Sequence, residues 1–251
     1  MGVGSPTNGS KGLNTDFADL LEAVAAVDGV DRIRFISPHP YYMTDRVIEA
    51  MATLPEVCES LPLPVQSGSN PILKKMLRNY TREQYLERVQ ELRNATPGMT
   101  LSTDIIVGFP GETAADFRET MSLIEEAQVD WRFVFKYSTQ EGTPAASFEN
   151  LPQELIEERH QECLALVKRM ALKKRWRLVG TTQEVLVEAD NIGRTRTNYK
   201  VNVRGNVLPG EIVLVRITNA QRATLEGVVE DDHVTFANFR EEESQTGYRA
   251  R

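Results

Sequence analysis

The feature that most constrains the fold is a regular alternation of short apolar runs and amphipathic segments over the first 150 residues. The runs at 32–37, 61–65, 101–107 and 131–138 predict β-strands, and helical segments stand between them. Strands that alternate with helices typically form a parallel sheet with crossover helices. The strands are apolar nearly throughout, so we expect both faces of this sheet to be covered.

The helices are predicted from the spacing of apolar residues and from capping signals. A first helix is expected to begin near Thr15, and a second is expected over 44–53. The apolar face of the first helix comprises Phe17, Leu20, Leu21, Val24 and Val27. Thr81 and Gln84 are spaced as a capping box, and Thr113 is expected to cap a further helix.

The pattern changes after a long helical segment at 152–176. Beyond Leu178 apolar and polar residues alternate in short segments separated by glycine and proline, which predicts a small β-barrel. We therefore predict an α/β domain over 1–178, an all-β domain over 179–242, and a disordered tail over 243–251.

Composition excludes several classes of protein. Of the 251 residues, 41% are hydrophobic and 26% are charged, which is ordinary for a soluble globular protein. No apolar run approaches the roughly 20 residues that cross a bilayer, and the first residues do not resemble a signal peptide, so we expect a cytoplasmic protein with no membrane partner. Cys58 and Cys163 are too few for a disulfide framework. His39, His160 and His233 lack metal-ligand spacing.

The charge distribution bears on nucleic-acid binding. The formal net charge is −7, whereas a generic nucleic-acid binder is usually basic. The segment 168–177, KRMALKKRWR, nevertheless carries six cations and no acid. A local basic stripe permits RNA binding on an acidic protein, and the alternative is a solvated helix face.

Polar, glycine-containing loops follow three of the predicted strands: QSGS at 66–69, GFPGET at 108–113 and YSTQEGT at 137–143. The carboxyl ends of parallel strands are where α/β folds bind ligands, and glycine lets a ligand approach the backbone closely. We therefore expect a ligand site at this edge, with ordinary strand-to-helix turns as the alternative. No arrangement of a nucleophile with a general base emerges.

Three blocks of this sequence resemble successive blocks of the radical-SAM methylthiotransferases of the tRNA-modifying MiaB type. They are LPLPVQSGSNPILKKMLRNYTREQYLERV, LSTDIIVGFPGETAADFRET and FVFKYSTQEGTPAA. ISPHP precedes them in the family's order, and the segments 191–205 and 210–227 resemble the TRAM domain that closes these proteins. The resemblance covers roughly residues 14–232.

The resemblance implies a partial parallel (β/α) barrel of the radical-SAM type, with about four of six strand–helix units, followed by a small OB-like TRAM barrel. The family uses S-adenosylmethionine and 4Fe-4S clusters to add a methylthio group to isopentenyladenosine next to the anticodon of tRNA. Its clusters require two sets of cysteines, and neither set is present in this chain. We therefore expect the rest of the enzyme to lie upstream of residue 1, and this chain alone to be inactive.

The resemblance also implies site residues, none of them catalytic or metal-binding. Those expected to approach S-adenosylmethionine are Gln66, Ser67, Val107, Gly108, Pro110, Tyr137 and Ser138. Those expected to contact tRNA are Lys173, Lys174, Arg175, Arg177, Arg194, Arg196, Lys200, Arg204 and Arg216. Tyr199 or Trp176 is expected to stack on a base.

Two other interpretations of the function remain open at this point. The first is a non-catalytic RNA-binding protein that retains TRAM, whose affinity for tRNA would weaken steeply with salt and need no iron. The second is an unrelated α/β enzyme with a metal-free site, which the absence of an acid–base or nucleophile arrangement disfavours.

Overall fold

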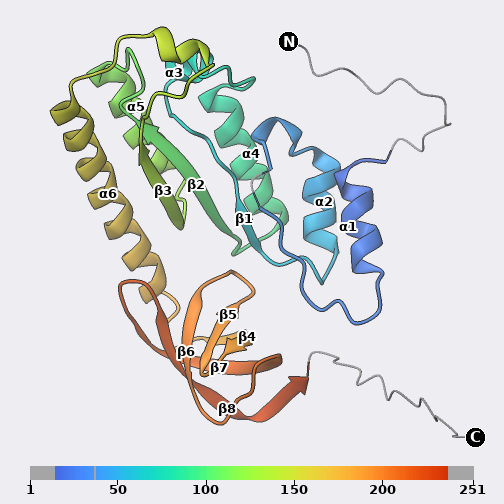
Figure 1. Ribbon diagram of the computed structural model, residues 1–251. Helices are drawn as coiled ribbons and strands as arrows, with labels where there is room; N and C mark the ends of the chain where they lie inside the picture. The colour runs from blue at the N-terminus through green and yellow to red at the C-terminus, as the bar shows by residue number, and fades with distance from the viewer. Residues whose placement is uncertain (1–14, 37, 237–251) are drawn as a thin grey trace, which may run out of the picture.

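The computed structural model describes residues 15–36 and 38–236, and the predicted tail over 243–251 lies outside them. Helices and parallel strands alternate along the first part of the chain (Figure 1). The helices are α1 Phe17–Ala25, α2 Asp45–Thr53, α3 Asn70–Lys75, α4 Arg82–Ala95, α5 Ala114–Glu126 and α6 Gln153–Trp176, with short 3₁₀ turns at Pro40–Tyr42 and Pro144–Ser147. The strands of this part are β1 Ser60–Pro62, β2 Thr100–Val107 and β3 Trp131–Lys136.

Side-chain caps explain where most of these helices begin. Capping boxes at Thr81 and Thr113 start α4 and α5, which confirms both predictions. Thr44 caps α2, and Asp16 caps α1, which begins at Phe17, close to the predicted start near Thr15. Each cap satisfies amide groups of the first turn that have no partner within the helix.

The sheet has the order β1-β2-β3, and both pairings are parallel. The strand predicted over 61–65 is regular only to Pro62, because the prolines at 62 and 64 have no amide group to donate. Pairing with β2 nevertheless continues, since the Gln66 amide donates to the carbonyl of Asp104 at 2.9 Å. The strand predicted over 32–37 is reduced to one parallel bridge between Ile33 and Val57.

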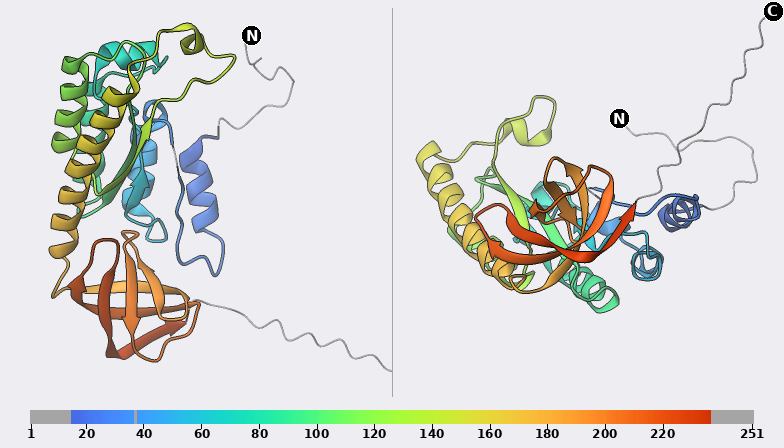
Figure 2. Two further views of the ribbon diagram at one scale, coloured as in Figure 1. Left: turned by 60° about the vertical axis from the view of Figure 1, so that its left-hand side comes forward. Right: turned by 90° about the horizontal axis from the view of Figure 1, so that it is seen from below.

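The two faces of the sheet differ, and the prediction that both would be covered is wrong for the residues that the structure describes. Helices pack on the face that carries Leu101, Ile105 and Val107, each 0% exposed. On the opposite face Asp104 is half-buried and its neighbour Phe133 is 65% exposed. In the left view of Figure 2, α5 and α6 lie on one side of the sheet.

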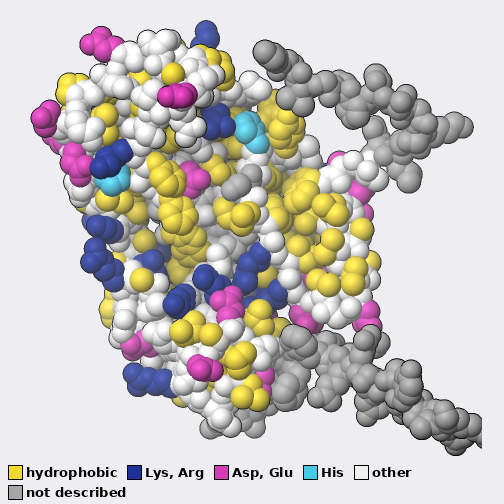
Figure 3. All heavy atoms as spheres, in the orientation of Figure 1, with side chains coloured by type: hydrophobic (Ala, Val, Ile, Leu, Met, Phe, Trp, Pro, Cys, Tyr) yellow, Lys and Arg dark blue, Asp and Glu magenta, His cyan; other side chains and the backbone are white. Residues whose placement is uncertain are grey.

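The first helix buries less of its apolar face than its sequence predicts. Ala18 and Leu21 are buried, but Leu20 and Val27 are each 54% exposed. This helix packs against α2, and nothing among the described residues covers its outer side. Apolar side chains are visible both over the open side of the sheet and over the region of α1 in Figure 3.

The second part of the chain is a closed barrel with the strand order β4-β5-β6-β8-β7, which together with the parallel sheet confirms the predicted fold class. Its strands are β4 Thr182–Ala189, β5 Ile192–Thr195, β6 Lys200–Arg204, β7 Glu211–Ala220 and β8 Leu225–Phe236. Alternate side chains point inward and form a core of valines with Ile217 and Leu225. No helix among the described residues is long and apolar enough to span a membrane.

The barrel is docked against the amino ends of the sheet strands. The Arg196 guanidinium binds both carboxylate oxygens of Glu59, with Nε 3.0 Å from each. The Arg32 side chain, 5% exposed, pairs with Glu184 at 2.8 Å. Tyr199 packs edge-on against Trp131. These contacts place the barrel at the end of the sheet opposite the predicted ligand edge.

Candidate functional site

The loops after β1, β2 and β3 meet at the carboxyl edge of the sheet, as the sequence predicts. A cavity of about 550 Å³ opens there between the end of α3, the ends of β2 and β3, and the 3₁₀ turn at Pro144–Ser147. Phe109 and Tyr137 form one wall, with their rings edge-to-face and their centroids 5.1 Å apart. The Tyr137 hydroxyl is buried and has no hydrogen-bond partner among the described residues.

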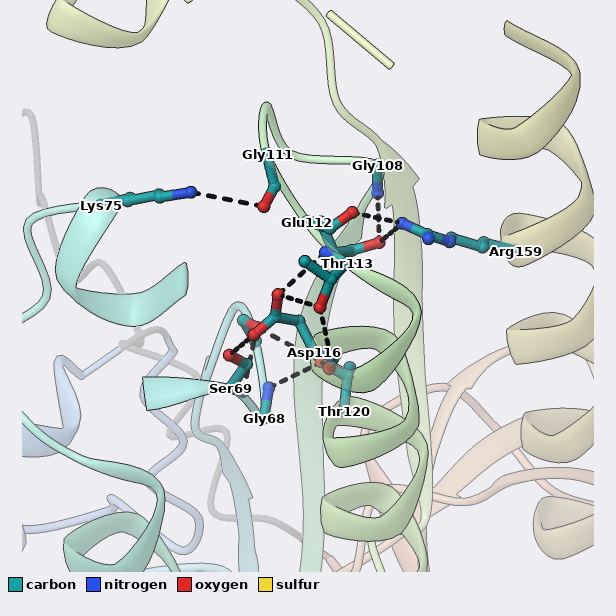
Figure 4. Close-up of polar contacts among 11 residues, drawn as sticks. Gly68, Ser69, Lys75, Gly108, Gly111, Glu112, Thr113, Asp116, Thr120 and Arg159 are labelled. Carbon is teal, nitrogen blue, oxygen red and sulfur yellow. Dashed lines mark hydrogen bonds and ion pairs between the residues drawn. The ribbon is translucent and has the colours of Figure 1, made fainter. Parts of the chain in front are cut away.

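The GFPGET loop is held from beneath by a buried ion pair. Glu112 accepts hydrogen bonds from the Arg159 guanidinium at 2.6 Å and from the Gly108 amide at 3.2 Å (Figure 4). Arg159 comes from α6, so this pair joins the loop after β2 to the long helix. Gly108 has φ +76°, and a Cβ there would lie 2.7 Å from the Ile156 side chain, so glycine is the residue that fits.

The QSGS loop is packed against α5 rather than open to solvent. Ser67 is fully buried, and its hydroxyl lies 3.3 Å from that of Thr120. The Ser69 hydroxyl caps α3 and donates to Asp116 at 2.5 Å (Figure 4). A Cβ at Gly68 would lie 2.5 Å from the Thr120 backbone, which explains the glycine. Ser67, which the resemblance predicts to approach S-adenosylmethionine, therefore helps to build the loop itself, as does Ser69.

The predicted cofactor residues fall into two groups. Tyr137 and Ser138 line the 550 Å³ cavity, and Pro110 lines a neighbouring one of about 470 Å³. The remaining four lie in the loops and strand ends behind these cavities: Gln66, Ser67, Val107 and Gly108. None of these four residues lines either cavity.

Sequence reasoning missed the cations of this cavity. Lys75, Arg78 and Lys136 line it, and no acidic side chain does. Lys136 is the last residue of β3, whereas Lys75 and Arg78 lie at and just after the end of α3, a short helix that the sequence did not predict. Their convergence on one cavity was therefore not visible in the sequence. Deeper on the open face, burial raises the pKa of Asp104 above its usual value.

The residues predicted to bind RNA are also divided. Lys173, Arg177, Lys200, Arg204 and Arg216 are exposed. Arg196 binds Glu59, and Arg175 donates to the carbonyl of Arg222. Lys174 pairs with Asp130 at 3.0 Å, and Arg194 pairs with Glu188 at 3.0 Å. Lys and Arg side chains gather between the sheet and the barrel in Figure 3.

The two aromatic residues proposed for base stacking differ in accessibility. Trp176 is 52% exposed at the end of α6. Tyr199 is 6% exposed, packs on Trp131, and donates to Asp130 at 3.2 Å. Burial and the nearby carboxylate raise the pKa of Tyr199. Tyr199 is therefore part of the interface between sheet and barrel, and its predicted role as a stacking platform is wrong.

The described residues do not fit an iron–sulfur cluster. Cys58 and Cys163 are both buried, and burial raises the pKa of the Cys58 thiol, which disfavours the thiolate form that iron requires. Among the described residues no group of three or more His, Cys, Asp or Glu side chains is arranged to hold a metal ion.

Comparison with known proteins identifies both parts of the chain. Residues 7–124 match the Radical SAM superfamily, and residues 177–229 match the TRAM domain. The tRNA-2-methylthio-N(6)-dimethylallyladenosine synthase of Clostridium botulinum (strain Loch Maree / Type A3) is 46% identical over 220 residues, which are 84% of this chain and 49% of that protein. The protein of the same name from Pelotomaculum thermopropionicum is 42% identical over 227 residues, 87% of this chain and 51% of that one.

Among solved structures, coproporphyrinogen III oxidase (HemN) from Escherichia coli, a radical SAM enzyme, is similar with a TM-score of 0.47 at 14% identity, over 76% of this chain and 49% of that one. The chain spans about half the length of the curated relatives that it matches. The chain therefore belongs to the MiaB-type family of radical-SAM methylthiotransferases, in which it represents part of the radical-SAM domain followed by the TRAM domain.

Proposed function

We propose that this chain is part of an enzyme that adds a methylthio group to isopentenyladenosine next to the anticodon of tRNA. Its own contribution is to hold S-adenosylmethionine at the carboxyl edge of the sheet and tRNA on the barrel. The observation that carries this proposal is the 550 Å³ cavity, lined by aromatic rings and cations, at the edge where parallel α/β folds bind ligands. The reaction that we propose is taken from the name of the similar proteins, tRNA-2-methylthio-N(6)-dimethylallyladenosine synthase.

The cavity suits S-adenosylmethionine in size and in chemistry. Small-molecule sites commonly have volumes of about 300–1,000 Å³ and mostly apolar walls with a few polar groups. Phe109 and Tyr137 supply the apolar wall, and Tyr137 and Ser138 supply hydroxyl groups. When bound, S-adenosylmethionine would supply the methyl group and, together with a cluster, the radical.

The described residues of this chain include no set that fits the cluster the reaction needs. Iron–sulfur clusters need thiolate ligands, and Cys58 and Cys163 do not fit that role. We therefore assign no step of the reaction to the residues present here, and we propose that the chain alone is inactive and acts together with the remaining portion of the enzyme.

The barrel supports tRNA binding through its exposed cations. Arg204 and Arg216 are exposed, and their only ion-pair partners among the described residues are acids 3.8 Å away. Such weakly held side chains are available to phosphates, whereas Arg196 is committed to Glu59. Lys200 adds a third exposed cation to the barrel.

Binding of a tRNA anticodon stem-loop by fluorescence anisotropy tests the RNA half of this proposal. We expect the Arg204→Ala, Arg216→Ala double variant to weaken binding roughly tenfold. The slope of the logarithm of the binding constant against the logarithm of the salt concentration should become shallower by about two, the loss of about two phosphate contacts. Arg118→Ala removes an exposed cation of α5 and should leave binding unchanged. Equal affinities for the double variant and the parent would contradict a role of the barrel in tRNA binding.

A calorimetric titration with S-adenosylhomocysteine tests the cofactor half. Saturable binding at one site would support the cavity as the cofactor site. Binding of tRNA together with no binding of the adenosyl ligand would favour the other candidate, a non-catalytic RNA-binding protein.

A further inference from the structure

Three aromatic side chains form a row on the open face of β3. Trp131, Phe133 and Phe135 occupy alternate positions of the strand, so they point to the same side of the sheet. Trp131 packs edge-on against Tyr199 and thereby belongs to the contact with the barrel. Phe133 and Phe135 are 65% and 48% exposed, and their rings lie 25° from parallel with centroids 6.2 Å apart. The open face therefore presents two neighbouring aromatic rings to solvent.

A cationic hollow of about 260 Å³ lies at the barrel end of this row. Phe133 lines it together with Arg175, Arg194 and Lys200, and no acidic side chain among the described residues does. Arg194 pairs with Glu188 at 3.0 Å. Neither Arg175 nor Lys200 pairs with a carboxylate among the described residues. The hollow therefore holds an excess of positive charge beside an exposed aromatic ring.

The Arg175 guanidinium is half-buried and only partly satisfied. Its Nη1 atom donates to the carbonyl of Arg222 at 2.7 Å, and this is its one side-chain hydrogen bond among the described residues. A guanidinium has five N–H donors, and burial without an anion removes hydration that nothing replaces. An anion in the hollow would compensate that loss, and the exposed ammonium of Lys200 lines the same hollow. In Figure 3, Lys and Arg side chains gather below the apolar side chains of the sheet.

An acidic side chain determines which part of a nucleotide suits Phe133. Asp104 is the partner of Phe133 in the parallel pairing of β2 with β3. Its carboxylate has no hydrogen-bond or ion-pair partner among the described residues. A carboxylate repels a phosphate but accepts hydrogen bonds from the N–H groups of a base edge. Aromatic rings stack on nucleobases of any sequence. A base therefore fits at Phe133, and a phosphate fits at the cationic hollow.

We propose that Phe133 stacks against an unpaired nucleobase of RNA, while Arg175 and Lys200 hold a phosphate of the same strand at the junction of sheet and barrel. This inference rests on the proposed function, and it adds to the exposed barrel cations a site for a single strand. A base within a duplex has both faces covered by its neighbours, so this site selects the loop of an RNA and not its stem. Phe135 lines the 550 Å³ cavity, so a strand bound on this row leads toward that cavity.

Fluorescence anisotropy with two RNAs tests the stacking. One is a tRNA anticodon stem-loop, and the other is a blunt duplex of the same stem. We expect Phe133→Leu to weaken stem-loop binding roughly 5- to 100-fold, the range of one base–aromatic stack, and to leave duplex binding within about twofold. Phe133→Trp keeps an aromatic ring and should bind the stem-loop at least as tightly as the parent. Phe148→Leu, the same change at a phenylalanine that is 42% exposed elsewhere, should leave both affinities unchanged.

The salt dependence of stem-loop binding separates the base contact from the phosphate contact. Arg175→Gln should make the slope of the logarithm of the binding constant against the logarithm of the salt concentration shallower by about one, the loss of one phosphate contact. Glutamine can still donate to the carbonyl of Arg222, so the contact between α6 and the barrel is retained. Phe133→Leu should leave the slope unchanged, because a stacked base carries no charge.

Three results would overturn the inference. The first is parental stem-loop affinity in Phe133→Leu alongside weakened binding in the Arg204→Ala, Arg216→Ala double variant, which would leave the proposed function standing. The second is equal weakening of stem-loop and duplex binding by Phe133→Leu, which would show an indirect effect on the fold. The third is loss of self-association in sedimentation by Phe133→Leu with parental RNA affinity, since a second copy of the chain would then cover this face. If the parent binds neither RNA, the proposed function fails first and the inference with it.

Discussion

The side chains on the two faces of the central strand β2 differ in burial, although they alternate residue by residue along the strand. Leu101, Ile105 and Val107 point toward the helices and are completely buried. Between them, Asp104 and Ile106 point to the open face and remain partly exposed. Both sets are hydrogen-bonded to a neighbouring segment: Asp104 and Ile106 bond to Gln66, whereas the carbonyls of Leu101 and Val107 accept from Asp130 and Tyr137 at the two ends of β3. Backbone pairing is therefore equal on the two sides, and side-chain burial is what distinguishes them.

This difference shows which parts of the fold are fully packed by elements of this chain. The covered face is complete within this chain, since helices α4, α5 and α6 pack around the sheet. The closed barrel is also complete, because each of its strands has two neighbours. The open face keeps Phe133 and Phe135 exposed.

The largest change in stability is expected from truncation of Leu101 on the covered face. We expect Leu101→Ala to lower the free energy of unfolding by about 3 kcal/mol, because it leaves a cavity in a sealed core. Urea denaturation followed by circular dichroism measures the change. Ile106→Ala, on the same strand but on the open face, should cost about 1 kcal/mol. Equal losses for the two variants would show that the open face is covered in solution.

Two consecutive leucines of α1 allow a similar comparison with a smaller effect. Leu21 is 3% exposed and Leu20 is 54% exposed. Leu21→Ala should lower the unfolding free energy by about 2 kcal/mol, since its side chain is packed. Leu20→Glu should leave it within about 0.5 kcal/mol and should reduce self-association in sedimentation experiments, because it places a charge in an exposed apolar patch. A marked loss of stability in Leu20→Glu would mean that something covers this helix.

Sequence patterns predicted the fold well where local signals and packing agreed. The capping box at Thr81, the cap at Thr113, the long helix ending at Trp176 and the small barrel were all predicted from local sequence patterns. The strand predicted at 32–37 did not form because only Ile33 finds a partner for its backbone. Whether a strand exists depends on its neighbours, and these are not encoded within the segment itself.

The site was less predictable, for a physical reason. A matching sequence block does not separate a side chain that faces a ligand from one that satisfies a neighbouring loop. Ser67, which the resemblance predicts to approach S-adenosylmethionine, is buried against α5. Likewise, Arg196 looked available in the sequence, but Glu59 lies more than a hundred residues away and its pairing depends on how the barrel docks. Arg78 was missed because an unpaired cation is visible only once all of its neighbours are known.

The smallest predicted effect concerns Asp104, the half-buried carboxyl group of the open face. Burial raises its pKa above the unfolded value of 3.8, so folding favours the protonated form. Its contribution to stability is therefore fully present below that unfolded value and is lost as the pH rises through the folded pKa. Asp104→Asn removes the charge at every pH. We expect the variant to raise Tm by about 1–3 °C at pH 7 and to leave it unchanged at pH 3, as measured by differential scanning calorimetry. A lower Tm at pH 7 would instead mean that the carboxylate has a stabilising partner in solution. The open face would then be covered near Asp104.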